Sequence, residues 1–351
     1  MALLADFVAL RASLPRLEPG DEIVLRDDGG TACALLRQKR GEPRNFAFEN
    51  GVARELRLQD DGGIPAARLC TDAASICAAL EPTIGPVREP LLVAWRPGKR
   101  AVLRMRRGET TVFVKLLDKR SYRRASSAFE SLRAADGPLA FALPESMLPD
   151  LCAYAAVAAP GKPLHDMLAD AQSPPWGLVD RAVRALASAH CPADLPRQDF
   201  ASARDAAIKM LSRASCVDHR CAKLAERVAN LCPPSQTREG FVHGDLHDKQ
   251  MFLASESAWL IDLEGCSRGD SNFDLVNLAE HLRLRALQRD GKDDGLCDSM
   301  LDRFAISHEV RMAWGLCVRA RLVGVYAMRP RHADVVGTLF TSLDSSLPDQ
   351  E

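Results

Sequence analysis

The sequence predicts an α+β protein with mainly antiparallel strands in its N-terminal part and mostly helices in its C-terminal part. Before residue 120, short apolar runs alternate with turn-forming pairs such as Asn50-Gly51, which are typical of antiparallel hairpins. After residue 175 the apolar residues recur at helical spacing, first over residues 176–190. These two patterns, in this order along the chain, indicate the fold class.

The composition is that of a globular protein with no strong charge preference. The chain has 351 residues, of which 47% are hydrophobic and 26% charged, and its formal net charge is −1. A nearly neutral chain gives no electrostatic case for nucleic acid or an anionic membrane as partner. No apolar segment approaches the ~20 residues of a membrane span. We therefore expect neither partner, and nothing in the sequence determines an oligomeric state.

The 11 cysteines form no disulfide framework, which favours free thiols in a reducing compartment. The N-terminal residues lack the basic start and unbroken apolar run of a secretory signal, so we expect a cytoplasmic protein. Cys216, His219 and Cys221 have the spacing of half a zinc site, but no second ligand pair follows. We expect their thiols to pack on a helix.

Residues 1–90 carry the weakest signals. They contain an amphipathic helix from Ala2 to Leu17, strand-like runs, and a short helix from Asp72 to Leu80, capped by Thr71 or Asp72. We expect this region to be an extension that packs on the following lobe. A separate regulatory domain is the alternative.

Residues 241–264 contain the motif with the most specific spacing. His243-x-Asp245-x-x-x-x-Gln250 has the form of a kinase catalytic loop, whose Asp accepts the substrate hydroxyl proton and whose later amide binds a metal ion. Asp262 follows 12 residues after Gln250, where kinases place a second metal ligand. Such oxygen ligands suit Mg²⁺. The alternative is an ordinary polar loop, but two matched pieces in the right order favour catalysis.

With His-Gly-Asp-Leu-His at 243–247 and Ile-Asp-Leu-Glu at 261–264, the chain resembles the aminoglycoside phosphotransferase and choline kinase superfamily. The resemblance implies a bilobal, protein-kinase-like fold and a small-molecule kinase that uses Mg²⁺ and ATP or GTP. It makes Asp245 the catalytic base and Asp262 a metal ligand. Gln250 departs from the usual Asn, with the same amide oxygen on a longer stem. This departure leaves an alternative, a kinase-fold protein that binds nucleotide without phosphotransfer.

A basic hairpin precedes this motif. The turn Arg96-Pro-Gly-Lys-Arg100 joins two strand-like runs, and it resembles the hairpin of the maltokinase branch of this superfamily. We expect Gly98, Lys99 and Arg100 to cover the phosphates. Lys115 ends the third apolar run, where kinases place the lysine that pairs with the phosphates. The alternative for Lys115 is a strand-end lysine that reaches water.

In kinases, a helix glutamate holds the phosphate-binding lysine. Glu130 is the only acid between Lys119 and Ala135 and is the expected partner, unless it is an exposed helix residue. The strand, small residues and Pro160-Gly161 that follow resemble a family hinge, where backbone groups near Ala155 and Val157 would hold the adenine. The predicted parts are an extension (1–90), an N-lobe with hinge (91–160) and a helical C-lobe with the acceptor site (161–351).

After Asp262 the chain enters a helix almost at once, without the activation segment and Ala-Pro-Glu motif of protein kinases. This absence favours a small-molecule acceptor. The resemblance implies that Asp274 braces the catalytic loop, and Glu264 is a weaker candidate for metal or acceptor binding. From Ser271 onward there are 12 acids and 10 Lys and Arg, which is unlike a site for polycationic aminoglycosides. Three of these arginines, at 311, 319 and 321, equally fit a solvated face.

The sequence therefore predicts transfer of the γ-phosphate of ATP or GTP to a hydroxyl of a sugar, amino alcohol or antibiotic-like acceptor. We expect Asp245 to deprotonate the hydroxyl and Lys249 to neutralise charge on the transferring group. Gln250 and Asp262 would hold Mg²⁺, and Lys115 would position the phosphates.

Overall fold

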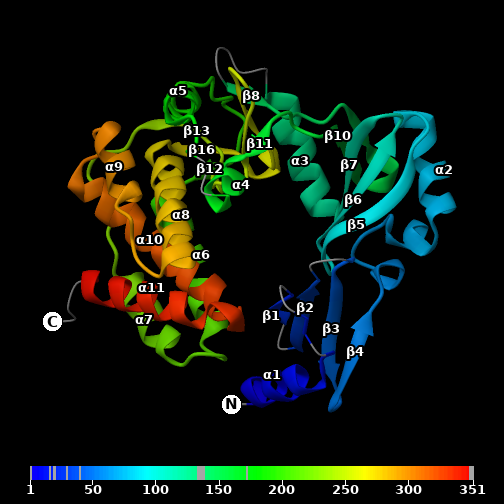
Figure 1. Ribbon diagram of the computed structural model, residues 1–351, viewed down its shortest axis with the longest axis horizontal. Helices are drawn as coiled ribbons and strands as arrows, with labels where there is room; N and C mark the ends of the chain where they lie inside the picture. The colour runs from blue at the N-terminus through cyan, green and yellow to red at the C-terminus, as the bar shows by residue number, and fades with distance from the viewer. Residues whose placement is uncertain are drawn as a thin grey trace. The chain divides into compact units, whose positions relative to one another are not determined.

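The computed structural model describes residues 2–15, 17–18, 21–28, 31–38, 41–132, 139–170 and 173–347. The chain forms two compact units, whose elements are labelled in Figure 1. The first comprises Met1–Glu130 and Ala142–Ala159, and the second Ser131–Phe141 and Pro160–Glu351. The boundaries that we predicted at residues 90 and 160 stay a prediction.

The first unit begins with α1 (Ala2–Ser13) and a four-stranded antiparallel sheet, in the order β1-β2-β3-β4. At the turn before β4, Asn50 and Gly51 both have positive φ, 53° and 81°, as the predicted Asn-Gly hairpin requires. The strands are β1 (Glu22–Asp28), β2 (Thr31–Arg37), β3 (Arg44–Glu49) and β4 (Val52–Leu56).

A second antiparallel sheet of this unit has the order β5-β6-β7-β10-β9. Helix α2 (Ala73–Ile84) precedes it and is capped by Asp72, whose carboxylate accepts from the Ser75 N–H. Helix α3 (Lys119–Ser131) follows β7. The strands are β5 (Arg88–Arg96), β6 (Arg100–Arg107), β7 (Thr110–Leu117), β9 (Ser146–Leu148) and β10 (Ala153–Val157).

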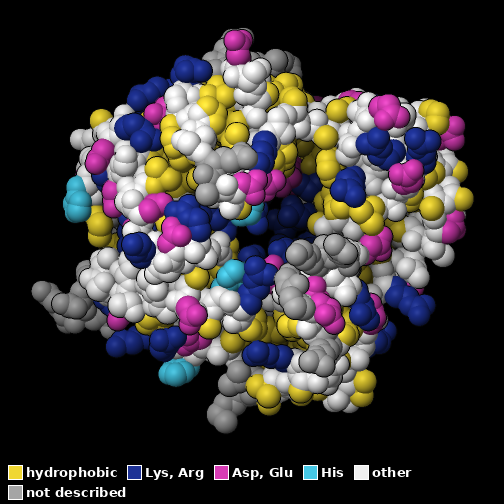
Figure 2. Space-filling view, in the orientation of Figure 1, with side chains coloured by type: hydrophobic (Ala, Val, Ile, Leu, Met, Phe, Trp, Pro, Cys, Tyr) yellow, Lys and Arg dark blue, Asp and Glu magenta, His cyan; other side chains and the backbone are white. Residues whose placement is uncertain are grey.

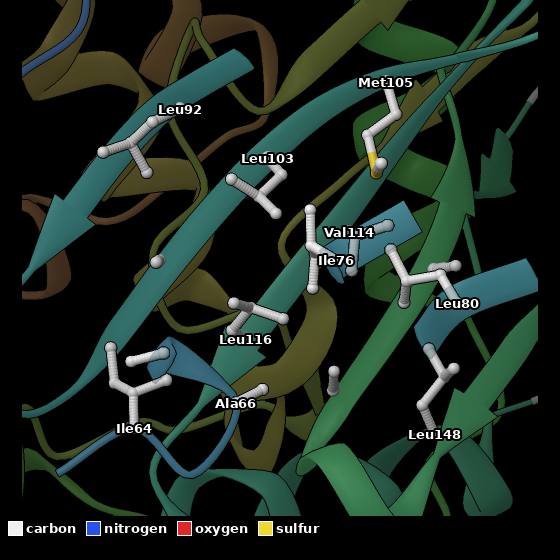
Figure 3. Close-up of a cluster of buried hydrophobic side chains, with 14 of the residues drawn as sticks. Ile64, Ala66, Ile76, Leu80, Leu92, Leu103, Met105, Val114, Leu116 and Leu148 are labelled. Atoms are coloured by element: carbon white, nitrogen blue, oxygen red, sulfur yellow. The ribbon is translucent and has the colours of Figure 1, made fainter. Parts of the chain in front are cut away.

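One hydrophobic cluster joins the α2 region to this second sheet. Figure 3 shows Ile76 and Leu80 of α2 pointing toward side chains of the strands, among them Leu103 and Val114. Because side chains between residues 58 and 87 belong to this cluster, this region shares one core with the sheet. Burial of each large apolar side chain in this core contributes roughly 1.5–3 kcal/mol to folding.

The second unit is mostly helical. Its two small sheets have the orders β11-β14-β15-β8 and β12-β16-β13. The helices are α4 (Leu164–Ala169), α5 (Trp176–Ala187), α6 (Phe200–Ala214), α7 (Arg220–Ala229), α8 (Asn272–Asp290), α9 (Leu296–Arg303), α10 (His308–Ala327) and α11 (Ala333–Ser346). The strands are β8 (Leu139–Phe141), β11 (Lys162–Pro163), β12 (Arg197–Gln198), β13 (Glu239–Val242), β14 (Met251–Leu253), β15 (Ala258–Leu260) and β16 (Ser267–Asp270). The predicted α+β class, strands first and helices later, is confirmed.

Helices α8 and α10 pack against one another in the middle of this unit (Figure 1). Both bury residues on nearly all of their faces. Polar residues in such helices need partners within the protein. This requirement brings their buried polar side chains together.

The charged side chains mix both signs over the surface. On the face seen in Figure 2, Lys and Arg are interspersed with Asp and Glu, in line with the net charge of −1. All 11 cysteines are free thiols, and burial in α7 raises the pKa of Cys221 to about 12. Among the described residues, none of the helices has the length and apolar character needed to cross a membrane.

Candidate active site

The loop between β13 and β14 holds the predicted catalytic residues. β14 and β15 pair in antiparallel register, with Met251 opposite Leu260. Just beyond this pair, the Ile261 N–H donates to the Gln250 carbonyl at 3.1 Å. The hairpin thereby joins residues that are 12 positions apart, and Gln250 Nε2 donates to Asp262 Oδ2 at 3.1 Å. The strand, loop and hairpin that the sequence predicted are present.

Asp262 has a left-handed backbone, with φ 61° and ψ 41°, at the start of the turn Leu263–Gly265. Non-glycine residues rarely adopt this region, although Asp tolerates it better than most. Such conformations cluster at functional sites. The strained backbone therefore favours a functional role for the Asp262 carboxylate.

His243 connects the loop to the far strand. Its Nε2 lies 2.9 Å from the Ile261 carbonyl, and its Nδ1 lies 3.4 Å from the Asp245 N–H. Since a carbonyl only accepts, Nε2 carries the proton and Nδ1 accepts. The His243 ring thus fixes the loop backbone at Asp245.

Asp274, the third residue of α8, braces the start of the loop. Its two carboxylate oxygens accept from the N–H groups of His243 (2.5 Å) and Gly244 (3.0 Å). Burial raises the pKa of Asp274 to about 6, although His243 and the two backbone donors favour the charged form. A helix residue therefore determines the path of the loop.

This pKa leads to a prediction about stability. Between about pH 4 and 6 the folded protein keeps a proton on Asp274 that the unfolded chain releases, so stability falls as pH rises through this window. A shift from 3.8 to about 6 corresponds to about 3 kcal/mol. From pH 4 to 6, urea unfolding should show that the wild type loses about 3 kcal/mol of unfolding free energy relative to Asp274→Asn, whose amide does not titrate. A difference that does not vary with pH would contradict the raised pKa.

Asp245 lies beside an arginine of α10. Arg321 Nη2 donates to Asp245 Oδ1 at 2.9 Å and to Asn277 Oδ1 at 3.1 Å. Asn277, on α8, also donates from Nδ2 to the Leu246 carbonyl at 2.6 Å. The Asp245 side chain is 51% exposed, so its carboxylate remains accessible while its position is fixed.

Asp248, three residues further on, is fully buried. It lies 2.6 Å from His165 Nδ1 and accepts from Arg285 Nε at 2.7 Å. Burial opposes its charge, but His165, His247 and Arg285 hold the pKa of Asp248 well below its usual range. This buried ion pair connects the loop to α4 and α8.

The comparisons with known proteins agree with this geometry. Residues 42–306 match the phosphotransferase enzyme family. The chain belongs to this family. The predicted family and the predicted class of enzyme, a phosphotransferase acting on hydroxyl groups, are therefore confirmed. A search of the curated proteins found no match.

Solved structures give distant likenesses to this phosphotransferase. Choline kinase LicA from Streptococcus pneumoniae has 11% identity and a TM-score of 0.49, covering 77% of this chain and 96% of its own. A thermostable mutant of aminoglycoside phosphotransferase APH(4)-Ia has 11% identity and a TM-score of 0.49, covering 77% and 97%. APH(3'')-Id from Streptomyces rimosus has 17% identity and a TM-score of 0.48, covering 68% and 92%. We infer no substrate of this phosphotransferase from them.

The expected phosphate-binding residues lie in the first unit. Lys115, on β7, is buried, and its ammonium lies 5.8 Å from the centre of the Tyr154 ring. Glu130, on α3, is exposed and accepts from the Ser126 hydroxyl at 3.0 Å. The pairing of Lys115 with Glu130 stays a prediction.

The basic turn between β5 and β6 is held from outside the hairpin. Asp61 Oδ2 accepts from the Gly98 N–H at 2.8 Å and from Trp95 Nε1 at 2.9 Å. Lys99 pairs with Asp118 at 4.0 Å, and Arg100 is exposed. The Gly98 N–H is thus already used, and phosphate binding by this turn stays a prediction.

The predicted adenine contacts lie on β10. Ala155 is buried and its carbonyl accepts from the Glu145 N–H at 2.9 Å, whereas Val157 is 41% exposed. The role of both residues stays a prediction.

Lys249 lies near several positive charges. Desolvation and the charges of Arg285 and Arg329 lower its pKa. His247 stacks on His281, with ring centres 4.7 Å apart, and both lie close enough to Asp248 to form a candidate metal cluster. Because Arg285 already neutralises Asp248, this cluster is a poor cation site.

Sequence reasoning missed the supporting residues of α8. Residues 277, 281 and 285 follow Asp274 at intervals of three or four and so lie on one helical face. The recurrence of polar residues at this spacing was the available signal. The solvated-face alternative is wrong for Arg319, which is buried and donates to Glu280, and for Arg321. Arg311 instead pairs with Asp302 at 2.6 Å.

Proposed function

We propose that this phosphotransferase is a small-molecule kinase, which transfers the γ-phosphate of ATP or GTP to a hydroxyl of a sugar, amino alcohol or antibiotic-like acceptor. The observation that carries the proposal is the loop between β13 and β14, on which Asp245 remains half-exposed while Gln250 meets Asp262 across the β14–β15 hairpin. A base beside a candidate pair of metal ligands is what phosphoryl transfer requires. The free thiols favour the cytoplasm as its compartment.

In the proposed reaction the acceptor hydroxyl donates a hydrogen bond to Asp245. The hydroxyl oxygen bonds to the γ-phosphorus as the bond from that phosphorus to the β–γ bridging oxygen breaks, and ADP or GDP leaves with its electron pair. The hydroxyl proton passes to Asp245. Lys249 offsets negative charge on the transferring group, and Lys115, held by Glu130, positions the phosphates.

Gln250 and Asp262 fit a magnesium ion by their chemistry. Their amide and carboxylate converge to 3.1 Å, and both offer the oxygen ligands that Mg²⁺ prefers. An amide can be turned end for end without changing its shape, which would present the Gln250 oxygen. When bound, the ion would neutralise charge on the nucleotide phosphates.

One observation favours the second candidate, a nucleotide-binding protein without transfer. Gln250 directs its nitrogen toward Asp262, where the family usually has the shorter Asn. A metal bound through this amide would need the amide to turn.

The test measures release of ADP from ATP, or of GDP from GTP, with Mg²⁺ over a panel of sugars, amino alcohols and aminoglycosides. We expect release that an acceptor stimulates in the wild type and that Asp262→Ala loses, because Asp262 would hold the metal on the phosphates. No stimulated release, together with nucleotide-induced thermal stabilisation, would favour the nucleotide-binding alternative.

A further inference from the structure

Four cations lie around the loop that carries Asp245, beside carboxylates that already have partners within the protein. Within the second unit, Arg285 donates to the Tyr326 hydroxyl at 3.4 Å and Arg329 lies 4.6 Å from the centre of the Tyr326 ring. Both charges lower the pKa of the neighbouring Lys249. Arg321 adds a fourth cation, in contact with Asp245. Asp248, the other loop carboxylate, is already bound by Arg285 and His165.

Arg321 is a fixed charge with part of its surface open. Its two hydrogen bonds both use Nη2, which leaves Nη1 with no hydrogen bond to the described residues. Its side chain is 26% exposed. Asn277 connects the guanidinium to the loop backbone, which holds the charge next to the base.

A guanidinium in this place selects the charge of the acceptor. Its planar donors match carboxylate and phosphate groups, whereas an ammonium group beside Asp245 would meet a like charge at close range. An acceptor hydroxyl must lie about 2.6–3.2 Å from its base. Arg321 Nη2 is 2.9 Å from that base, so an anionic group within a few bonds of the hydroxyl reaches the guanidinium.

We infer that the acceptor carries a carboxylate or phosphate group close to its reacting hydroxyl, and that Arg321 binds this group. The inference rests on the proposed kinase function and narrows its substrate class to hydroxy acids and phosphorylated polyols or sugars. A role of Arg321 limited to positioning Asp245 makes a different prediction. It would affect kcat for every acceptor alike, whereas anion binding affects KM for the anionic acceptors alone.

The test compares acceptors that differ in charge. Glucose is set against gluconate and glucose 6-phosphate, glycerol against glycerate and glycerol 3-phosphate, with choline and glucosamine as cations. In the wild type we expect at least one anionic compound to exceed its neutral counterpart tenfold in kcat/KM. Arg321→Gln should lower that kcat/KM roughly 10- to 100-fold, mainly through KM, as loss of a hydrogen bond to a charged group does. Comparing the carboxylate compounds with the phosphate compounds shows which of the two anionic groups Arg321 binds.

Arg311→Gln is the matched control, because Arg311 lies on the same helix and pairs with Asp302; it should keep the preference for anions. A wild type that prefers neutral or cationic acceptors would overturn the inference, as would an Arg321→Gln variant that loses kcat equally for all compounds.

Failure of the proposed function would give a different result, because no compound would then stimulate ADP release. Calorimetric titration of gluconate and glucose 6-phosphate, with a non-hydrolysable ATP analogue present, then decides the anion site. Binding by the wild type that Arg321→Gln loses supports the site, and no binding by the wild type overturns it.

Discussion

Asp245→Asn is expected to lower acceptor-stimulated phosphotransfer by roughly 10²- to 10⁴-fold, the usual contribution of a general base. The substitution keeps an oxygen for the hydrogen bond from Arg321 but removes the group that takes the hydroxyl proton. Nucleotide affinity should stay nearly unchanged, because Asp245 would contact the acceptor and not the nucleotide. Initial rates and nucleotide titrations on the same preparation measure both quantities.

Asp205→Asn is a suitable control, since Asp205 lies on α6 with its side chain 70% exposed. It should leave both the rate and nucleotide affinity unchanged. If Asp245→Asn kept more than a tenth of the wild-type rate, Asp245 could not be the general base. Loss of nucleotide binding would instead indicate a misfolded loop.

Arg285→Met should destabilise the protein by about 3–5 kcal/mol, which is the cost of leaving a buried charge unpaired. The carboxylate of Asp248 is fully buried, and Arg285 supplies two of its hydrogen bonds, at 2.7 and 3.2 Å. Unfolding by urea, followed by circular dichroism, gives the loss directly.

The double variant Asp248→Asn with Arg285→Met separates the ion pair from packing. Since the two residues are in contact, the double variant should lose less stability than the sum of the single variants. Strict additivity would show that the pair contributes no coupling energy, and would leave His165 as the main partner of Asp248.

The part of the candidate site that could be predicted from sequence is the part made by neighbours in the chain. Gln250 and Asp262 meet because a short antiparallel hairpin joins them, and alternating apolar residues with a turn encode such a hairpin. The motif spacing therefore indicated both residues correctly as a pair, although their metal-binding role stays a prediction.

The contacts that could not be predicted cross long stretches of sequence. Arg321 reaches Asp245 over 76 residues and Arg285 reaches Asp248 over 37. Such contacts depend on how α10 and α8 pack, which local patterns do not specify. An arginine in the middle of a helix that is buried all round cannot be left unpaired, and this rule would have argued against a solvated face for Arg319 and Arg321.

The polar face of α8 also limits where residues can be inserted into the chain or deleted from it. Asp274, Asn277, His281 and Arg285 share a face only because each residue turns the helix by about 100°. Deleting one residue between them would rotate the later side chains away from the loop they support, while leaving the composition of the helix almost unchanged. Insertions and deletions should therefore be tolerated in the exposed loop between α8 and α9, at residues 291–295, and excluded from the helix itself.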